Sequence, residues 1–145
     1  PLSMELFQLT NLMTLHLQHG QFTGLLPSEI GRLTNLQDLN IYGNNLRGQI
    51  PLEIGTLTRL RSLDLSENQF TGTIPTQIGT LIDLEVLAIH QREGVSNIGG
   101  PLPALDDFPH LKEVNLEYNA LTGSIPSNFL ARIADKSNEI SISLG

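Results

Sequence analysis

The sequence predicts an α/β solenoid with a parallel β-sheet along its concave face and short 3-10 or helical turns on its convex side. Three observations support this prediction. The chain repeats itself with a regular period, a proline recurs at one position of each period, and apolar residues alternate with polar ones in the first half of each period. A unit of about 24 residues cannot bury its apolar face alone, so neighbouring units must stack and share one core.

The repeat is visible when the chain is written in lines of one period each. Periods that start at Leu9, Leu33 and Leu57 match almost column by column, as in "LTNLQDLNIYGNNLRGQIPLEIGT" and "LTRLRSLDLSENQFTGTIPTQIGT". A fourth and longer period starts at Leu81, and a fifth starts at Phe108. A column of prolines, each preceded by Leu or Ile, fixes this register: Pro27, Pro51, Pro75, Pro103 and Pro126.

The first half of each period predicts a short strand. In the third period, Leu63 and Leu65 alternate with polar residues, which is typical of a strand that buries one face. Because similar periods stack in register, equivalent strands should lie side by side in one parallel sheet, about 4.8 Å apart. Asn and Gly residues follow these strands and predict the turns that end them.

The second half of each period predicts a bent return path. Gly72 stands where the backbone must turn, and Pro75 cannot donate a hydrogen bond to a sheet ladder. Thr76, with Ser28 and Ser127 at the same position of other periods, suits the N-cap of a single helical turn. Each period is therefore predicted to run from strand to turn, bent segment and short helical turn.

Composition narrows the class of protein. Leu supplies 27 of the 145 residues, while Trp and Cys are absent, so the core must be aliphatic, and disulfides, thiolate metal sites and cysteine nucleophiles are excluded. Lys and Arg number 8 against 15 Asp and Glu, a formal net charge of −7 with no basic stripe for nucleic acid. No apolar run approaches the roughly 18 residues of a membrane span, so this segment is not expected to insert into a membrane.

The full repeat pattern, LxxLxLxxNxLxGxIPxxIGxLxxL, is present as "LRSLDLSENQFTGTIPTQIGTLIDL". It resembles the plant-specific class of leucine-rich repeat found in receptor-like kinases, receptor-like proteins and polygalacturonase inhibitors, and the resemblance covers essentially the whole chain. It implies a right-handed superhelical solenoid in which the "GxIP" segments form a second sheet. It also implies that Asn44, Asn68 and Asn119 form a structural ladder, whose buried amides bond backbone groups of adjacent turns.

The fourth period departs from this pattern. Arg92 occupies the ladder position, as Gly20 does in the first period, and the chain lengthens to "HQREGVSNIGGPLP". We expect Asn97 to take over the ladder role after an inserted loop, Gln91 to Asn97. An irregular loop on a rigid scaffold is a better functional candidate than a consensus position.

The ends of the chain predict an internal fragment of a longer array. Pro1 matches the proline of a preceding period, and "EISISLG" predicts the first strand of a sixth. Solenoid ends need polar caps, and neither polar terminal helices nor the cysteine pairs usual in this family's caps are present. We expect a single domain over residues 1–145 with about six turns and partial repeats at both ends, its full repeats starting near Leu9, Leu33, Leu57, Leu81 and Phe108.

The residues that flank the buried strand positions are predicted to point outward from the concave face. The resulting grid includes Asp38, Asp64, Glu113 and Glu117 but no Lys or Arg, so a protein or peptide of basic or amide-rich character would suit it. Tyr42 adds an aromatic side chain of a kind enriched at interfaces. The alternative is that this acidity is only that of a solvated sheet face. The candidate ligand-binding residues are His16, Gln18, Asp38, Asn40, Tyr42, Asp64, Ser66, His90, Asn115 and Glu117.

The sequence predicts no metal site, cofactor or catalytic centre. His16 and His90 are three periods apart, about 14 Å by strand spacing, which is too far to share an ion. Asp106 and Asp107 are adjacent in a short connection and are typical of solvated turn residues. No Ser/His/Asp arrangement, phosphate loop or kinase signature is present, so the chain is not expected to be an enzyme.

The resemblance and the predicted face together favour a protein- or peptide-recognition module, most commonly the ligand-binding part of a receptor-like protein. Two alternatives stay open: an extracellular inhibitor of the polygalacturonase-inhibitor type, and a structural or adhesive spacer without a specific ligand. An ice-binding role, known for one plant relative, is not favoured because the outward strand positions do not repeat Thr or Asn in flat rows. The family favours an extracellular or cell-surface location, although the sequence contains no N-x-S/T motif for glycosylation.

Overall fold

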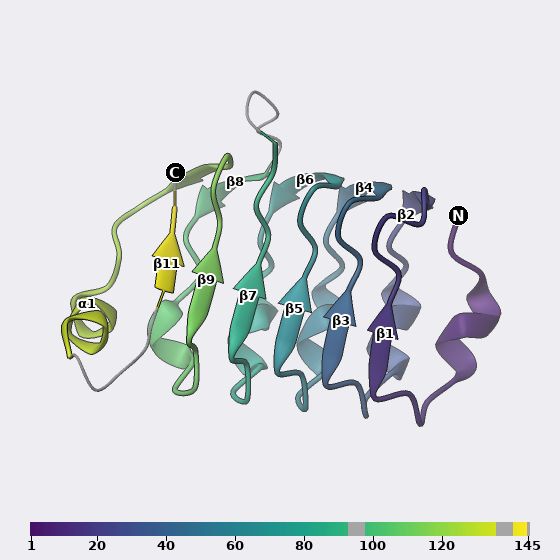
Figure 1. The fold of residues 1–145 in the computed structure, drawn as a ribbon, viewed down its shortest axis with the longest axis horizontal. Coiled ribbons are helices and arrows are strands. Elements are labelled where there is room, and N and C mark those ends of the chain that lie inside the picture. The colour runs from purple at the N-terminus through teal and green to yellow at the C-terminus, as the bar shows by residue number, and fades with distance from the viewer. Residues whose placement is uncertain (93–97, 136–140, 145) are drawn as a thin grey trace.

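The computed structural model shows the curved solenoid that the repeat predicts (Figure 1). It describes residues 1–92, 98–135 and 141–144. Successive periods lie side by side along the long axis of the molecule, with the first period at the right of the view and the fifth at the left (Figure 1). The path within one period is the predicted one, since β5 (Ser62–Asp64) is followed by a turn, β6 (Gln69–Thr73) and the 3-10 helix η4 (Thr76–Thr80).

The first sheet contains six short parallel strands within the described residues, in the order β1-β3-β5-β7-β9-β11. Neighbouring strands pair at equivalent repeat positions, so Leu15 lies beside Leu39. The register continues past the lengthened fourth period, because Leu87 pairs with Val114. The terminal segment "EISISLG" supplies the last strand. The strands are β1 (Thr14–His16), β3 (Asp38–Asn40), β5, β7 (Val86–Ala88), β9 (Glu113–Asn115) and β11 (Ser141–Ser143).

The second sheet lies behind the first in Figure 1, and its strands are the residues that lead into the "GxIP" segments, with Gly48 and Gly72 inside β4 (Asn45–Gln49) and β6. Gly48 and Gly72 have φ of +81° and +83°, a left-handed conformation that glycine adopts without strain, so these two residues allow the chain to bend before each Ile-Pro. Five strands are seen in the described ranges, in the order β10-β8-β6-β4-β2: β2 (Thr23–Leu25), β4, β6, β8 (Ile98–Pro101) and β10 (Ala120–Thr122).

Short helical segments return the chain on the side away from the first sheet. The predicted capping role of Ser28, Thr76 and Ser127 is wrong, because the preceding proline is the N-cap residue in each case and no side chain makes a capping hydrogen bond. Proline suits this position because its fixed φ holds the extended conformation that leads into the turn. The segments are the 3-10 helices η1 (Met4–Gln8), η2 (Ser28–Arg32), η3 (Leu52–Thr56), η4 and η5 (Leu105–Asp107), and the α-helix α1 (Ser127–Ala134).

Threonine residues at the ends of the 3-10 helices connect neighbouring periods. The Oγ1 atom of Thr80 lies 2.8 Å from the carbonyl oxygen of Gln77 in its own turn and 2.5 Å from that of Gly55 in the preceding period. Thr56 makes the equivalent contacts one period earlier, at 2.8 and 2.9 Å. The "IGT" ending of these periods therefore stabilises the stacking on the convex side.

The core is a continuous aliphatic spine that runs through all periods. Leu33, Leu57 and Leu81, which start consecutive periods, are fully buried. Phe108 occupies the same repeat position and is also fully buried, so a phenyl ring replaces leucine where the irregular fourth period ends. Each such side chain contributes about 1.5–3 kcal/mol on burial, and the stacked rows hold the two sheets in fixed relative positions.

Candidate functional site

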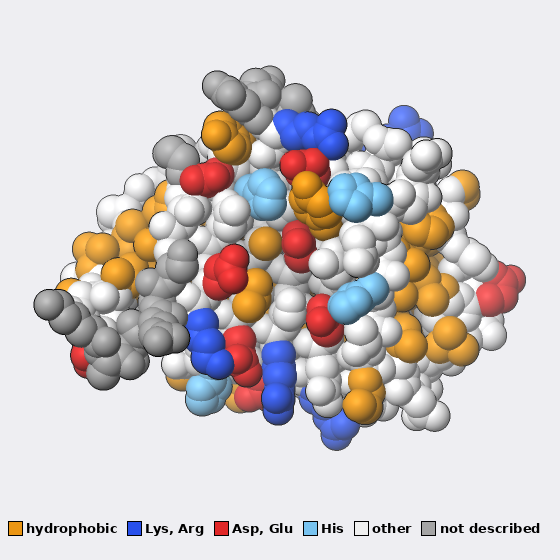
Figure 2. All heavy atoms as spheres, in the orientation of Figure 1, with side chains coloured by type: hydrophobic (Ala, Val, Ile, Leu, Met, Phe, Trp, Pro, Cys, Tyr) orange, Lys and Arg blue, Asp and Glu red, His pale blue; other side chains and the backbone are white. Residues whose placement is uncertain are grey.

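The outer face of the first sheet carries the residues that the sequence predicts to contact a ligand. In β1, β3, β5 and β9 the middle residue is buried while its neighbours are exposed or half-buried, as Thr14 and His16 are on either side of Leu15. Figure 2 shows this face, with acidic and histidine side chains over the strands and Lys and Arg toward its upper and lower margins. Nine of the ten candidates are exposed or half-buried: His16, Gln18, Asp38, Asn40, Tyr42, Asp64, His90, Asn115 and Glu117.

Three of these candidates also support their own turns. The Oδ1 atom of Asn40 accepts the backbone N–H two residues later at 3.1 Å, and Asp64 and Asn115 repeat this bond at 2.9 and 3.2 Å. Asn and Asp are suited to this local bond because their short side chains reach the backbone at that spacing. One oxygen of each side chain is therefore committed to the fold, and a ligand would meet the other carboxylate oxygen or the amide hydrogens.

His16 and Asp38 form a pair between the first two rows of the face. The Nε2 atom of His16 lies 3.0 Å from the Oδ2 atom of Asp38, and the two side chains are 45% and 38% exposed. A side-chain contact with this much access to water contributes little to stability. Asp38 can therefore exchange His16 for a cationic group of a ligand at low cost.

An aromatic cluster lies where these strands end. The ring of His19 packs edge-on against Tyr42 with centroids 4.9 Å apart, and the ring of His90 lies 6.2 Å from Tyr42. Tyr42 and His90 are two rows apart, about 9.6 Å by strand spacing, so their rings lean toward each other across the row between them.

Ser66 occupies that middle row and is fully buried, so it does not present the contact surface that the sequence predicts. The rings of Tyr42 and His90 come from the rows on either side of it and lie 6.2 Å apart. Its hydroxyl oxygen accepts the backbone N–H of His90 at 3.1 Å, which makes it part of the connection between rows. The alternation of buried and outward residues along a strand could not reveal this. It predicts which way a side chain points but not whether large side chains from neighbouring rows cover it.

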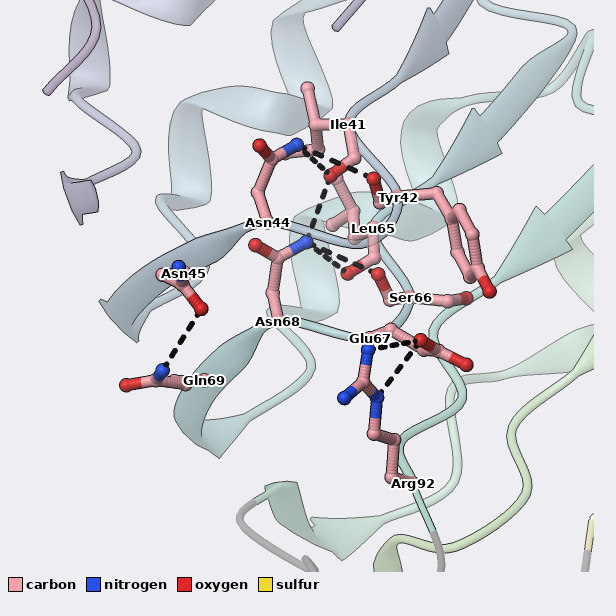
Figure 3. A network of polar contacts seen from close by, with 10 residues as sticks. All are labelled: Ile41, Tyr42, Asn44, Asn45, Leu65, Ser66, Glu67, Asn68, Gln69 and Arg92. Atoms are coloured by element: carbon pink, nitrogen blue, oxygen red, sulfur yellow. Dashed lines mark hydrogen bonds and ion pairs between the residues drawn. The ribbon is translucent and has the colours of Figure 1, made fainter. Parts of the chain in front are cut away.

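Glu67 and Arg92 form an ion pair beside the aromatic cluster. Neither residue is among the ligand-binding candidates predicted from the sequence. The Oε2 atom of Glu67 lies 3.0 Å from Nε of Arg92 and 2.9 Å from a terminal guanidinium nitrogen. Burial alone would raise the pKa of Glu67, but hydrogen bonds from Arg92 and Tyr42 hold that pKa below its usual value. Burial, together with the hydrogen bond and negative charge of Glu67, raises the pKa of Tyr42. The Glu67–Arg92 pair is drawn in Figure 3.

The backbone marks the position of Glu67 as unusual. Glu67 has φ of +50°, and the residues at the same repeat position in three other periods also have positive φ: His19 at +55°, Gly43 at +67° and Tyr118 at +58°. Glycine fills this position without strain, whereas other residues there cost about 1–2 kcal/mol. An imidazole, a carboxylate and a phenol kept at a strained position are a reason to examine this edge for function. In the sequence, the signal is a column that holds glycine in one period, at Gly43, and larger polar residues in the others.

The ladder asparagines bond the backbone of adjacent turns (Figure 3). The Nδ2 atom of Asn68 lies 2.9 Å from the carbonyl oxygen of Ile41 in the preceding period and 3.1 Å from that of Leu65 in its own turn. Its Oδ1 atom accepts the backbone N–H of Leu46 at 3.1 Å. Asn44 makes the equivalent bonds one period earlier, and both residues are buried.

The irregular fourth period interrupts this ladder. Asn119 donates to the carbonyl of Ile89 at 2.7 Å, but its Oδ1 atom is buried without a hydrogen-bond partner among the residues that the structure describes. Arg92 occupies the ladder position of the fourth period and turns its guanidinium to Glu67 instead. Asn97, predicted to replace it, lies outside the described residues, as does most of the loop.

A groove of about 660 Å³ opens beside the ladder. Its walls come from the turns that follow β3, β5 and β7 and from the first residues of β4 and β6. Glu67, Asn68 and Arg92 line it, and so do Arg47 and Gln91. It lies at the edge of the molecule formed by the turns that follow β3, β5 and β7, which we call the strand-end edge. This edge is next to the concave face but outside its rows.

The described residues offer recognition chemistry. Over residues 1–92, 98–135 and 141–144, no group of three or more His, Asp or Glu side chains is placed to hold a metal ion. None of the helices there is long and apolar enough to cross a bilayer. The contact groups of the face are carboxylates, imidazoles, amides and a phenol.

Comparison with known families agrees with this geometry. Leucine-rich repeat sequence profiles match residues 10–70 and residues 110–131. The chain belongs to the leucine-rich repeat family. A comparison of its sequence with curated proteins gives no significant match.

Solved structures of plant leucine-rich repeat proteins superpose on most of this chain. The plant peptide hormone receptor RGFR1, solved in complex with RGF2, is 36% identical with a TM-score of 0.81 over 89% of this chain and 20% of its own. The ectodomain of the Arabidopsis thaliana receptor kinase GASSHO1/SCHENGEN3, in complex with CASPARIAN STRIP INTEGRITY FACTOR 2, is 35% identical with a TM-score of 0.77 over 83% and 14%. A plant ice-binding protein is 30% identical with a TM-score of 0.74 over 88% and 40%. The leucine-rich repeats here are thus of the plant type, and the chain spans well under two thirds of each of these proteins.

Proposed function

We propose that this chain is a non-catalytic recognition module that binds a protein or peptide across its concave face, as the ligand-binding part of a receptor-like protein. The observation that carries the proposal is the charge of that face. Asp38, Asp64, Glu113 and Glu117 stand in its rows without a Lys or Arg in the same rows. A ligand with basic side chains would gain attraction from several carboxylates at once.

Structural neighbours support the same class of partner. RGFR1 was solved with RGF2, and GASSHO1/SCHENGEN3 with CASPARIAN STRIP INTEGRITY FACTOR 2. Both proteins share the repeat type and more than a third of their aligned residues with this chain. A rigid sheet with outward side chains suits an extended ligand because it is already ordered before binding and loses little entropy.

Each group on the face has a definite proposed contact. Asp38 and Asp64 would accept hydrogen bonds from Lys or Arg side chains, and Tyr42 would pack against apolar or cationic groups with its ring. Amide groups would bond the ligand backbone. The proposed contact residues are His16, Gln18, Asp38, Asn40, Tyr42, Asp64, His90, Asn115 and Glu117.

A double substitution tests the proposal. Twelve-residue peptides are selected by display against the wild-type chain, and the affinities of the tightest are measured by calorimetry against Tyr42→Ala/Asp64→Asn. Asn retains the Oδ1 atom that accepts the Ser66 N–H, so the turn should survive. We expect affinity to fall at least tenfold, as for the loss of two contacts of about 1 kcal/mol each. Tm should fall only slightly, through the lost contacts of Tyr42 with His19 and Glu67, so that the variant stays folded during the titration.

The matched control is Thr58→Ala/Asp83→Asn, which also removes one carboxylate but changes exposed residues away from the concave face. It should leave the affinity of every selected peptide unchanged. Equal affinity for the wild type and the Tyr42/Asp64 variant would refute the surface assignment. Selection of no peptide at all would favour the spacer alternative.

A further inference from the structure

The groove at the strand-end edge has the size and position of a ligand subsite. Its volume of about 660 Å³ lies within the range typical of small-molecule sites. Turns from three successive periods form it, so a peptide that follows the rows of the concave face would reach it by passing over the edge.

Most polar groups of the groove wall are already paired. The amide hydrogens of Asn44 and Asn68 are donated to backbone carbonyls, and their oxygens accept backbone N–H groups. Glu67 and Arg92 neutralise each other through their ion pair. Strong attraction for a net charge is therefore not expected from these residues.

Gln91 is a buried exception among the described residues of the groove wall. It is only 2% exposed, yet neither its Oε1 nor its Nε2 atom has a hydrogen-bond partner among the described residues. A buried amide without partners is destabilising, and any group that pairs with both atoms removes that cost. The side chain lines the groove, so a group bound in the groove is placed to pair with it.

We propose that the groove binds a primary carboxamide, the side chain of an Asn or Gln in the bound peptide, and that Gln91 recognises it. A primary carboxamide presents one C=O and one N–H side by side, so it can form two parallel hydrogen bonds with the amide of Gln91. A carboxylate offers no donor for the Oε1 atom of Gln91, and an apolar group leaves both atoms unpaired. This inference rests on the proposed peptide-binding function and assigns one residue class of the ligand.

Three small probes that differ in one group test the assignment. They are the N-acetyl N-methylamides of glutamine, glutamate and methionine, titrated into the ¹⁵N-labelled chain and followed by ¹H–¹⁵N correlation spectra. We expect the glutamine probe to shift the side-chain NH₂ signals of Gln91 and to bind at least fivefold more tightly than the other two. Equal affinities, or no binding, would overturn the proposal. Tighter binding of the glutamate probe would also overturn it, since that would assign an anion site to Arg47, which lines the groove.

A pair of variants separates Gln91 from the rest of the groove. Gln91→Met should abolish the preference for the glutamine probe, whereas Gln8→Met, an exposed position on η1, should retain it. Replacing an unpaired buried amide by an apolar group of similar size should also raise Tm by about 2–4 °C. A lower Tm would mean that the folded chain already satisfies this amide, which contradicts the proposal. Neither Tyr42 nor Asp64 is among the described residues that line the groove, so the result with these probes can be interpreted even if the concave-face test fails.

Discussion

Replacing Asn68 with alanine should break the polar connection between the second and third periods. The side chain bonds two backbone carbonyls at 2.9 and 3.1 Å and one backbone N–H, that of Leu46, at 3.1 Å, and the residue is only 4% exposed. In Asn68→Ala the Leu65 carbonyl and the Leu46 N–H would lose this partner at a place that water reaches poorly, while the Ile41 carbonyl would keep its bond from Asn44. An unpaired buried group costs about 1–3 kcal/mol, so an N–H and a carbonyl together predict a loss of about 2–6 kcal/mol. That is a large part of the roughly 5–15 kcal/mol that stabilises a domain.

Urea denaturation followed by far-ultraviolet circular dichroism measures this loss. The matched control is Asn45→Ala, since Asn45 is exposed and its described side-chain bond is a long one of 3.5 Å to Gln69. It should change stability by no more than about 0.5 kcal/mol. A loss below about 1 kcal/mol in Asn68→Ala would refute the reasoning that the ladder satisfies groups which nothing else can reach.

Three further substitutions test other contacts. The pKa of Glu67 lies below its usual value of 4.5, so its ionised form stabilises the fold above that pH, and the contribution is lost as pH falls through the lowered pKa. In urea denaturation at pH 7, Glu67→Gln should therefore be about 0.5–1 kcal/mol less stable than the wild type. At a pH well below the lowered pKa, the two proteins should be equally stable. The same difference in stability at both pH values would contradict this. Gly43→Ala should lower Tm more than Gly123→Ala. Both glycines have positive φ, but only at Gly43 would the new Cβ lie 2.6 Å from the His19 ring. Equal shifts in Tm would show that the ring moves aside freely. Thr80→Val should cost about 1 kcal/mol through the lost contacts to Gln77 and Gly55, while Thr58→Val at an exposed position should cost less than half of that in the same urea titration.

The repeat made most of the fold predictable from the sequence. The proline column set the register, and the alternation around Leu63 placed the strands of the first sheet, because both features repeat in every period. The second sheet followed from the resemblance of the "GxIP" segments to a known repeat class. The capping role of Ser28 was predicted wrongly, because the residue type suits a cap but the preceding proline takes that position.

The candidate site was less predictable, because it depends on how side chains from different periods meet. Ser66 stands at a strand position that should face outward, yet it is fully buried between the rows of Tyr42 and His90, whose rings lie 6.2 Å apart. Glu67 and Arg92 are not separated by a whole period, so the repeat alignment places them in different columns. The asparagine pattern identified Arg92 only as a departure at the ladder position, whereas the structure pairs its guanidinium with Glu67.

The central claim is that a protein or peptide partner binds the concave face, and mapping a bound peptide on the chain tests it most directly. The tightest peptide from the display selection is titrated into the ¹⁵N-labelled chain, and backbone amide shifts are assigned by residue. The account predicts that the largest shifts fall within residues 38–42, 62–66 and 86–90, on three neighbouring rows of the first sheet. Largest shifts within η2, η3 and η4, with those rows unchanged, would contradict it.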